Sequence, residues 1–304
     1  MKVFITGISG CVGHYLFDLL ANHPEYELYL IVRNRQTLKF DPAAYPQCHF
    51  IFDDMRHIEK YGDLLKQMEI VIHLAADWGG HWGNLNYSVS LFNLLDPAVC
   101  QKVIYFSTAS ILGQENKPLP AVEKLGTHYI RSKYQFYKKL PAFPIYPKVI
   151  TLSPTWVLGG DSLHPYSHAT TGIIEMRKWL WLIKFLQADV QFHYIHARDI
   201  ALITKYLMEH ETAEKNFVLG NKMITAQELI KEVAEFYHQR VYCQIPIPNW
   251  LINFFIFAGG RWLHSWDKYS LAKRHFVYQT TNCETFGLDN HLITLPQILK
   301  SIGL

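Results

Sequence analysis

A glycine-rich turn near the start of the chain constrains the fold more than any other feature. The apolar run Val3 to Ile5 comes first, and Thr6-Gly7-Ile8-Ser9-Gly10-Cys11-Val12-Gly13 then leads into a segment with leucines on one helical face. A strand, a glycine turn and a helix in this order favour a loop whose backbone amides bind phosphate, because glycine lets ligand and helix approach closely. The residues predicted to bind the pyrophosphate of a dinucleotide are Gly7, Gly10, Cys11, Val12 and Gly13.

Short apolar runs alternate with helical patterns through the first half of the chain. The predicted strands are residues 3–5, 28–32, 49–52, 70–74, 103–106 and 149–152. Continuous apolar runs are typical of strands that are buried on both faces, as in a parallel sheet covered by helices. The sequence therefore predicts an α/β fold built on a Rossmann doubly wound parallel sheet.

The regular alternation ends after residue 152. Residues 154–167 are predicted to form a loop, and helices are predicted over 199–209 and 225–238, the second with a capping box of Thr225 and Glu228. We predict a dinucleotide-binding Rossmann domain of residues 1–155 with 190–222. A smaller, mostly C-terminal substrate-binding lid domain would comprise 156–189 with 223–304 and cover the carboxyl ends of the strands, where such sheets bind ligands.

Composition argues against several classes of protein. The net charge of the 304 residues is only +3, so it indicates neither a nucleic acid nor an anionic membrane as a partner. The five cysteines contain no CxxC pair, so no disulfide framework is predicted. Among the sixteen histidines, His164 and His168 are four apart, but Pro165 lies between them and no carboxylate or cysteine cluster accompanies them, so no metal site is predicted. The N-terminus lacks a signal-peptide pattern, and we expect a cytoplasmic protein with a small-molecule substrate. Whether it forms a homodimer is left open.

Two apolar stretches, residues 179–186 and 250–263, are shorter than the ~20 residues of a membrane-spanning helix. We expect them to form buried or lid helices. The alternative is a surface that meets a lipid-like substrate or the membrane interface.

A tyrosine and a lysine four residues apart follow the fifth predicted strand. Ser107 and Thr108 end that strand, and Tyr129-Ile130-Arg131-Ser132-Lys133 lies on a predicted helix. Positions i and i+4 share a helix face, so the Lys133 ammonium is expected to lower the phenol pKa of Tyr129 from about 10. Tyr129 could then act as a general acid toward a carbonyl or as a general base toward an alcohol.

The YxxxK spacing and the GxxGxxG loop together resemble the short-chain dehydrogenase/reductase superfamily. Further segments resemble its extended branch, the NAD-dependent epimerase/dehydratase family with its dihydroflavonol-reductase-like members, from Lys2 to about Gly220. The resemblance implies that Thr108, Tyr129 and Lys133 are catalytic. It also implies that Thr108 hydrogen-bonds the substrate oxygen and that Lys133 hydrogen-bonds the nicotinamide ribose.

Other segments resemble family motifs that contact the cofactor. Residues 86–95 resemble the NVxGTxxNLL helix, residues 153–159 the RPxxVYG turn and residues 196–201 the HVxDVA segment. The resemblance implies cofactor contacts from Asp54, Met55, Leu74, Ala75, Ala76, Pro154 and Thr155.

The end of the second predicted strand bears on the choice of cofactor. NAD-binding proteins place Asp or Glu there on the ribose 2′-hydroxyl, whereas this chain has Arg33, followed by Arg35 and Lys39. A guanidinium suits a 2′-phosphate. We therefore predict NADP as the cofactor, with NAD as the alternative.

These observations predict an NADP(H)-dependent oxidoreductase that transfers a hydride to or from a small-to-medium carbonyl or alcohol substrate. A nucleotide-sugar epimerase or dehydratase with tightly bound NAD is the alternative, although Ala109 and Ser110 stand where sugar dehydratases carry acids. A non-catalytic dinucleotide sensor is a third hypothesis, against which Tyr129 and Lys133 argue.

Aromatic residues are the candidates for binding the substrate. Trp78, Trp82 and Trp156 stand in segments expected to open toward the pocket, and they would suit an apolar or ring-bearing substrate. The link between Ala76 and Asn86 is short, so the family's substrates cannot be carried over to this chain.

Overall fold

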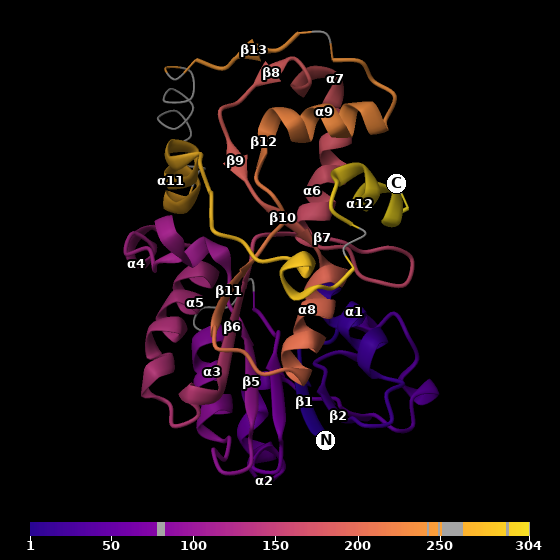
Figure 1. The fold of residues 1–304 in the computed structure, drawn as a ribbon, viewed down its shortest axis with the longest axis vertical. Coiled ribbons are helices and arrows are strands. Elements are labelled where there is room, and N and C mark those ends of the chain that lie inside the picture. Colours follow the sequence, from indigo (N-terminus) through magenta and orange to yellow (C-terminus); the bar gives the residue numbers. More distant parts are fainter. Residues whose placement is uncertain (78–82, 242, 249, 251–263, 290–291, 304) are drawn as a thin grey trace.

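The computed structural model describes residues 1–77, 83–241, 243–248, 250, 264–289 and 292–303. A parallel sheet of seven strands lies at its centre, in the order β11-β6-β5-β4-β1-β2-β3 (Figure 1). The strands are β1 (Lys2–Thr6), β2 (Glu27–Ile31), β3 (His49–Ile51), β4 (Ile70–His73), β5 (Lys102–Phe106), β6 (Val149–Pro154) and β11 (Asn216–Leu219). The strand order runs outward in both directions from β1, which confirms the predicted doubly wound Rossmann sheet.

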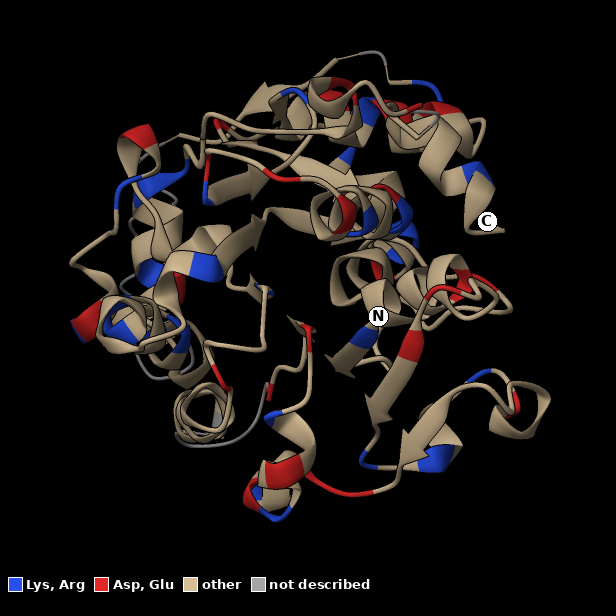
Figure 2. Cartoon of the chain, turned by 60° about the horizontal axis from the view of Figure 1, so that its bottom comes forward, with Lys and Arg blue, Asp and Glu red and all other residues tan. Residues whose placement is uncertain are grey.

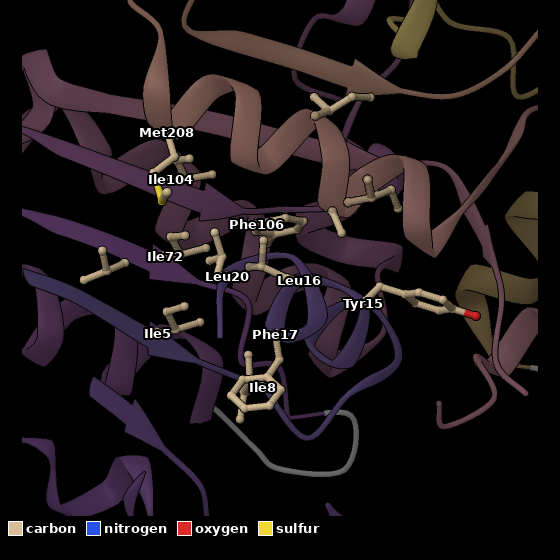
Figure 3. Packing of buried hydrophobic residues seen from close by; sticks show 14 of the residues in the cluster. Ile5, Ile8, Tyr15, Leu16, Phe17, Leu20, Ile72, Ile104, Phe106 and Met208 are labelled. Atoms are coloured by element: carbon tan, nitrogen blue, oxygen red, sulfur yellow. The ribbon is translucent and has the colours of Figure 1, made fainter. Parts of the chain in front are cut away.

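Helices cover both faces of the sheet, which explains the continuous apolar runs of its strands. Every residue of β4 and β5 is buried. One face packs against α1 (Cys11–Leu20) and α8 (Ala197–Glu209), and Figure 3 shows Leu16 and Leu20 of α1 among the sheet residues Ile72 and Ile104. The other face packs against α3 (Gly83–Asn93) and α5 (His128–Lys139), with the short helices α2 (Gly62–Leu65) and α4 (Val122–Leu125) nearby.

The structure corrects the sequence analysis in the stretch after β6. Residues 154–167 were expected to be a loop, but they contain β7 (Trp156–Leu158), which pairs in parallel with β10 (Tyr194–His196). A three-residue strand is fixed by its distant partner rather than by a local pattern. The later helix predictions are confirmed: α8 begins two residues before the predicted start, and α9 (Ala226–Phe236) carries the predicted capping box of Thr225 and Glu228.

The elements that lie beyond the carboxyl ends of the strands form what we call the cap region. They are α6 (His168–Met176), α7 (Leu180–Ile183), β8 (Leu186–Gln187), β12 (Ile224–Thr225), α9, β13 (Ile245–Pro246), α11 (Ser265–Lys273) and α12 (Leu295–Ser301), and β9 (Gln191–Phe192) pairs with β12. A separate apolar cluster includes Ile173, Leu180, Phe192, Val233 and Leu299. The predicted domain boundaries stay a prediction.

Charged residues of both signs are interspersed around the molecule, as Figure 2 shows. Within the described ranges, no helix combines the length and the apolar character that crossing a membrane requires. The described part of the cap region nevertheless carries exposed apolar side chains, to which we return below.

Candidate active site

The carboxyl ends of the central strands open into a cavity of about 1020 Å³ between the sheet and the cap region. This volume is at the upper end of the range for small-molecule sites, about 300–1,000 Å³. Twelve of the residues predicted from sequence to bind cofactor or to be catalytic line it: Gly7, Gly10, Cys11, Val12, Gly13, Leu74, Ala76, Thr108, Tyr129, Lys133, Pro154 and Thr155. The structure thus brings together residues that are spread over five segments of the chain.

The turn after β1 packs so tightly that two of its glycines cannot be replaced. Gly7 has a φ of +80°, and a Cβ on it would lie 2.5 Å from the Ala75 amide nitrogen. A Cβ on Gly13 would lie 2.4 Å from the Gly7 carbonyl oxygen. Gly10 is different, because a Cβ there would meet only the Gly7 oxygen, at 3.4 Å. The predicted need for glycine at position 10 therefore rests on a ligand rather than on the protein's own packing.

The N-terminus of α1 fits the pyrophosphate of a dinucleotide. Its N-cap residue is Gly10, which offers no side chain to the first-turn amides, and the first turn contains no acidic residue. Gly10 and the next three residues line the cavity. Amide groups without a side-chain cap and the positive end of the helix dipole together favour an anion at this place. These residues would therefore hold the phosphates of the cofactor.

A chain of hydrogen bonds fixes the ring of His73 at the end of β4. The Ser88 hydroxyl donates to the Asn84 carbonyl oxygen at 2.6 Å, so it accepts from His73 Nε2 at 2.7 Å. His73 Nδ1 then accepts from the Thr6 hydroxyl at 2.7 Å, and Thr6 Oγ1 accepts from the Ala75 amide at 3.1 Å. This pattern assigns the neutral Nε2–H tautomer. Burial, followed by the nearby Lys133 charge, holds the pKa of His73 well below its usual value.

Asn84 carries this chain on to the catalytic helix. Its side-chain amide donates to the Asp77 carbonyl oxygen at 2.7 Å and to the Ser132 hydroxyl at 3.3 Å, and Ser132 is the residue before Lys133. The sequence analysis had aligned the family's asparagine with Asn86, but Asn86 is exposed and Asn84 is buried. The two asparagines differ in whether they lie on the face of α3 that turns toward the sheet. The sequence alone does not reveal which face that is, so it could not distinguish them.

Tyr129 and Thr108 come from different elements and meet in the cavity wall. Thr108 ends β5 and caps the short 3-10 helix η4 (Ala109–Ile111), whereas Tyr129 lies in the first turn of α5, capped by Thr127. Burial raises the pKa of the Tyr129 phenol well above its usual value, and a hydrogen bond with Thr108 acts in the opposite direction. The phenol is therefore protonated at neutral pH, as a general acid must be.

Lys133 is completely buried beneath the end of β5. Its Nζ donates to the Phe106 carbonyl oxygen at 2.7 Å and lies 5.0 Å from the centre of the Tyr105 ring. Burial lowers the pKa of Lys133 to about 7. The expectation that Lys133 lowers the pKa of Tyr129 is wrong for this structure, because loss of water shifts both groups toward their neutral forms.

The residues expected to contact the adenosine lie outside the cavity wall. Arg33 is exposed just beyond β2, and pairing of Thr6 with Ile31 places that strand end beside the phosphate loop. Arg33 forms no ion pair with any described residue, although its charge helps to lower the pKa of Asp54. By contrast, Arg35 forms an ion pair with Asp41 at 3.1 Å.

The other adenosine-side residues have structural contacts of their own. Asp54 accepts a hydrogen bond from the Arg56 amide and so caps the 3-10 helix η3 (Met55–Tyr61). Lys39 Nζ lies 3.5 Å from the Asp161 carbonyl oxygen, beside the cap region. Ala75 takes part through the hydrogen bond of its amide to Thr6. The roles predicted for these residues in cofactor binding stay predictions.

One of the three predicted substrate residues can be placed. Trp156 lines the cavity and stacks on Phe192, with ring centres 4.6 Å apart. Trp78 and Trp82 lie outside the described residues. The sequence analysis missed the contribution of α6 and α9, from which Ser167, His168, Ala169, Ile173, Met176 and Leu229 reach the wall. The one sequence signal for α6 was Ser167, which caps that helix.

Comparison with known proteins places these observations in a family context. Residues 3–220 match the sequence model of the NAD dependent epimerase/dehydratase family. No curated protein matches the chain. Among solved structures, UDP-glucose 4-epimerase from Thermotoga maritima is similar with a TM-score of 0.69 and 18% identity, over 99% of this chain and 97% of that one.

Two further structures show the same fold over nearly the whole chain. UDP-N-acetylglucosamine 4-epimerase from Methanobrevibacter ruminantium has a TM-score of 0.67 and 15% identity, covering 99% of this chain and 96% of its own. dTDP-glucose 4,6-dehydratase from Bacillus anthracis, in complex with NAD, has a TM-score of 0.67 and 14% identity, covering 99% and 95%. At these identities the likeness establishes the fold.

Replacement of Tyr129 by phenylalanine tests the assignment of the acid/base group. We expect Tyr129→Phe to reduce kcat by ~100-fold or more, the usual scale of general acid–base catalysis, while cofactor affinity is retained. Tyr137→Phe is the matched control, because its hydroxyl lies on the same helix, 3.4 Å from the Asn216 side chain. Steady-state kinetics measure the first effect and calorimetric titration the second. A fully active Tyr129→Phe enzyme would refute the assignment.

The lowered pKa of Lys133 predicts a pH-dependent effect on stability. Below pH 7 the lysine is charged in both states, and its burial costs stability. Between about 7 and 10.5 the folded state holds fewer protons than the unfolded state, so stability rises with pH. A Lys133→Met protein does not titrate there, so we expect its gain in melting temperature over the native protein to be larger at pH 6 than at pH 9.

The exposed Lys138 on the same helix supplies the control for this measurement. Its pKa is raised by the hydrogen bond to Glu123, so Lys138→Met should change the melting temperature by the same amount at both pH values. An equal difference at pH 6 and pH 9 for Lys133→Met would show that the buried amine does not titrate in this range.

Proposed function

The chain belongs to the NAD dependent epimerase/dehydratase family and is an enzyme, and within that family we propose that it is an NADP(H)-dependent oxidoreductase. Its substrate is an apolar carbonyl compound or the corresponding alcohol, of small to medium size. The nicotinamide supplies or accepts the hydride when the cofactor is bound.

The composition of the cavity wall carries the proposal for the substrate. Beyond Tyr129, most of the wall is apolar, and the polar Thr127, Ser167 and His168 also line it; the apolar residues are Ile130, Trp156, Val157, Ile173, Met176 and Leu229. Among the described residues that line the cavity, Lys133 is the only lysine or arginine, and its Nζ is held by the Phe106 carbonyl oxygen. A nucleotide sugar brings a second pyrophosphate, which proteins usually bind with basic side chains. This wall therefore favours an uncharged apolar substrate.

The chemistry of the reducing direction follows from the burial of the catalytic residues. Tyr129 keeps its proton because burial raises the pKa of its phenol, and it donates that proton to the substrate oxygen. The Thr108 hydroxyl, which already contacts Tyr129, is placed to hydrogen-bond the same oxygen. In its protonated form, Lys133 stabilises the phenolate that remains. Oxidation of an alcohol uses the same groups in reverse.

Arg33 supports NADP over NAD. It is exposed at the end of β2, where NAD-binding relatives of this fold carry an acid, and it has no ion-pair partner among the described residues. A guanidinium in this position can form charge-assisted hydrogen bonds with a 2′-phosphate. The solved structure of the dTDP-glucose dehydratase holds NAD, so this preference distinguishes our proposal from that neighbour.

We also propose that the enzyme works in a reducing compartment such as the cytoplasm. All five cysteines are free thiols, and three of them are buried. Disulfides are rare in that compartment.

Binding titrations with NADP and NAD test the choice of cofactor. Charge-assisted hydrogen bonds contribute ~1.5–3 kcal/mol, so the native protein should prefer NADP by about 10- to 150-fold. Arg33→Asp should reverse the preference, because a carboxylate repels the 2′-phosphate and accepts from a 2′-hydroxyl. Arg35→Asp makes the same charge change next to Asp41 and should have a smaller effect. Equal or tighter binding of NAD by the native protein would contradict the proposal.

Turnover assays decide between the two kinds of substrate. We expect NADPH oxidation with aromatic or medium-chain aldehydes and ketones, and no epimerisation or dehydration of UDP-glucose, UDP-N-acetylglucosamine or dTDP-glucose in the presence of NAD. Ile173→Asp places a charge in the apolar wall and should raise KM for the apolar substrate without weakening cofactor binding. Conversion of a nucleotide sugar, with no carbonyl reduction, would establish the epimerase or dehydratase alternative.

A further inference from the structure

The end of the cap region farthest from the sheet carries an apolar surface that the proposed reaction does not use. Trp179, Trp181, Leu182, Phe185 and Ile245 have exposed fractions of 60, 61, 43, 36 and 65%. They belong to α7, to the residues on either side of it and to β13, which lie together at the top of Figure 1. We call these five residues the apolar tip. Residues 179–186 were expected to form a buried or lid helix, and α7 is a helix of the cap region whose inner side alone is buried.

Strand pairing makes the apolar tip one continuous surface. β13 pairs in parallel with β8, which follows directly after Phe185. The Ile245 amide donates to the Phe185 carbonyl oxygen at 2.7 Å, so these two exposed side chains come from neighbouring backbone segments. The two tryptophans lie one turn earlier, at the start of α7. Residues about sixty positions apart in the sequence thus form one patch.

The helix at this tip is apolar on its inner and outer sides. Leu180 is completely buried and Ile183 packs against the same core cluster, so the inner side anchors α7 to the cap region. Trp181 and Leu182 face outward. Single exposed apolar residues are normal in proteins, but a contiguous group that contains two tryptophans marks an interaction surface. A helix that is apolar all round is normally covered on both sides.

The charges around the apolar tip are those that an anionic surface would attract. Arg177, Lys178, Lys184 and Arg240 lie in its two segments, and the acidic residues that flank these segments, Glu175, Asp189 and Glu235, are paired with Lys178, His275 and Lys231. Lys178 pairs with Glu175 from the preceding helix at 2.6 Å. Lys184 Nζ lies 5.4 Å from the centre of the Phe185 ring, so charge and apolar surface are adjacent.

We propose that the apolar tip docks on the surface of an anionic lipid bilayer. Tryptophan favours the boundary between lipid headgroups and acyl chains, and basic residues beside it gain from anionic headgroups. Trp179, Trp181 and Leu182 enter that boundary, and Lys184 meets the lipid phosphates.

The apolar tip is connected through α6 to the wall of the cavity, so docking would bring the cavity close to the membrane surface. α6, whose Ile173 and Met176 form part of the cavity wall, continues through the 3-10 helix η8 (Arg177–Trp179) into α7. Docking through α7 would therefore hold the apolar wall of the cavity close to the bilayer. The docking itself does not depend on which reaction the enzyme catalyses.

Co-sedimentation with lipid vesicles tests the proposal on the full chain. We expect the native protein to bind vesicles of phosphatidylcholine with phosphatidylglycerol and to bind pure phosphatidylcholine vesicles much more weakly. Trp179→Ser/Trp181→Ser should weaken binding by at least about 10-fold. Lys184→Ala should weaken it by about 5-fold, since a basic residue near an anionic surface contributes ~1 kcal/mol. Tryptophan emission of the native protein should shift to shorter wavelength on binding.

A matched pair of exposed residues at the opposite end of the sheet is the control. Val99 and Tyr146 are 37 and 42% exposed, and Lys148 holds their two turns together by bonding the Pro97 and Cys100 carbonyl oxygens. Val99→Ser/Tyr146→Ser should bind vesicles like the native protein. Circular dichroism and NADP titration show that each variant is folded.

Two results would overturn the proposal. The first is absence of native binding to the anionic vesicles. The second is equal binding by the native protein and the tryptophan double variant. If the first result is accompanied by a change of oligomeric state in the tryptophan double variant, measured by analytical ultracentrifugation, the apolar tip is a contact between two copies of the chain. A negative result in the vesicle experiments leaves the NADP titrations and the turnover assays of the proposed function unaffected.

Discussion

The close approach of three backbone segments at the turn after β1 is the constraint on which the active site depends. Gly13 brings α1 against the turn, and Gly7 brings the turn against Ala75 at the end of β4, with no room for a Cβ at either glycine. This contact places the Ala75 amide on the Thr6 hydroxyl and so starts the hydrogen-bond chain through His73. The phosphate loop and the catalytic helix are thereby held by one continuous set of bonds, which ends at Ser132 beside Lys133.

Burial of ionisable groups at the end of this chain sets the chemical character of the site. Tyr129 and Lys133 both lose contact with water, and the loss shifts each toward its neutral form. A phenol with a raised pKa keeps its proton at neutral pH, whereas an amine with a pKa of about 7 can change its charge near neutral pH. Neutral His73 contributes no competing positive charge. The same absence of water that keeps the Tyr129 phenol protonated therefore destabilises the charged form of Lys133.

The features that could be predicted from the sequence are those with a local pattern. Buried strands such as residues 70–74, the glycine turn and the Thr225 capping box each have a signature within a few residues, and all three are present in the structure. The strand β7 and the distinction between Asn84 and Asn86 depend on partners far along the chain, so they could not be read locally. The pKa of Tyr129 was predicted in the wrong direction, because spacing reveals the neighbouring Lys133 but not the depth of burial.

The position of β11 in the sheet has a consequence for the order in which the protein is assembled. β6 ends at Pro154, and the strand that pairs with its outer side begins only at Asn216. Ribosomes add about 5–20 residues each second, so the outer edge of β6 remains unpaired for roughly 3–12 seconds during synthesis, until β11 has been made. Through this interval the apolar stretch Val149–Leu152 presents unpaired amide and carbonyl groups, the arrangement that other extended chains can join. Translation speed between the two strands therefore bears directly on how much of the newly made chain escapes aggregation.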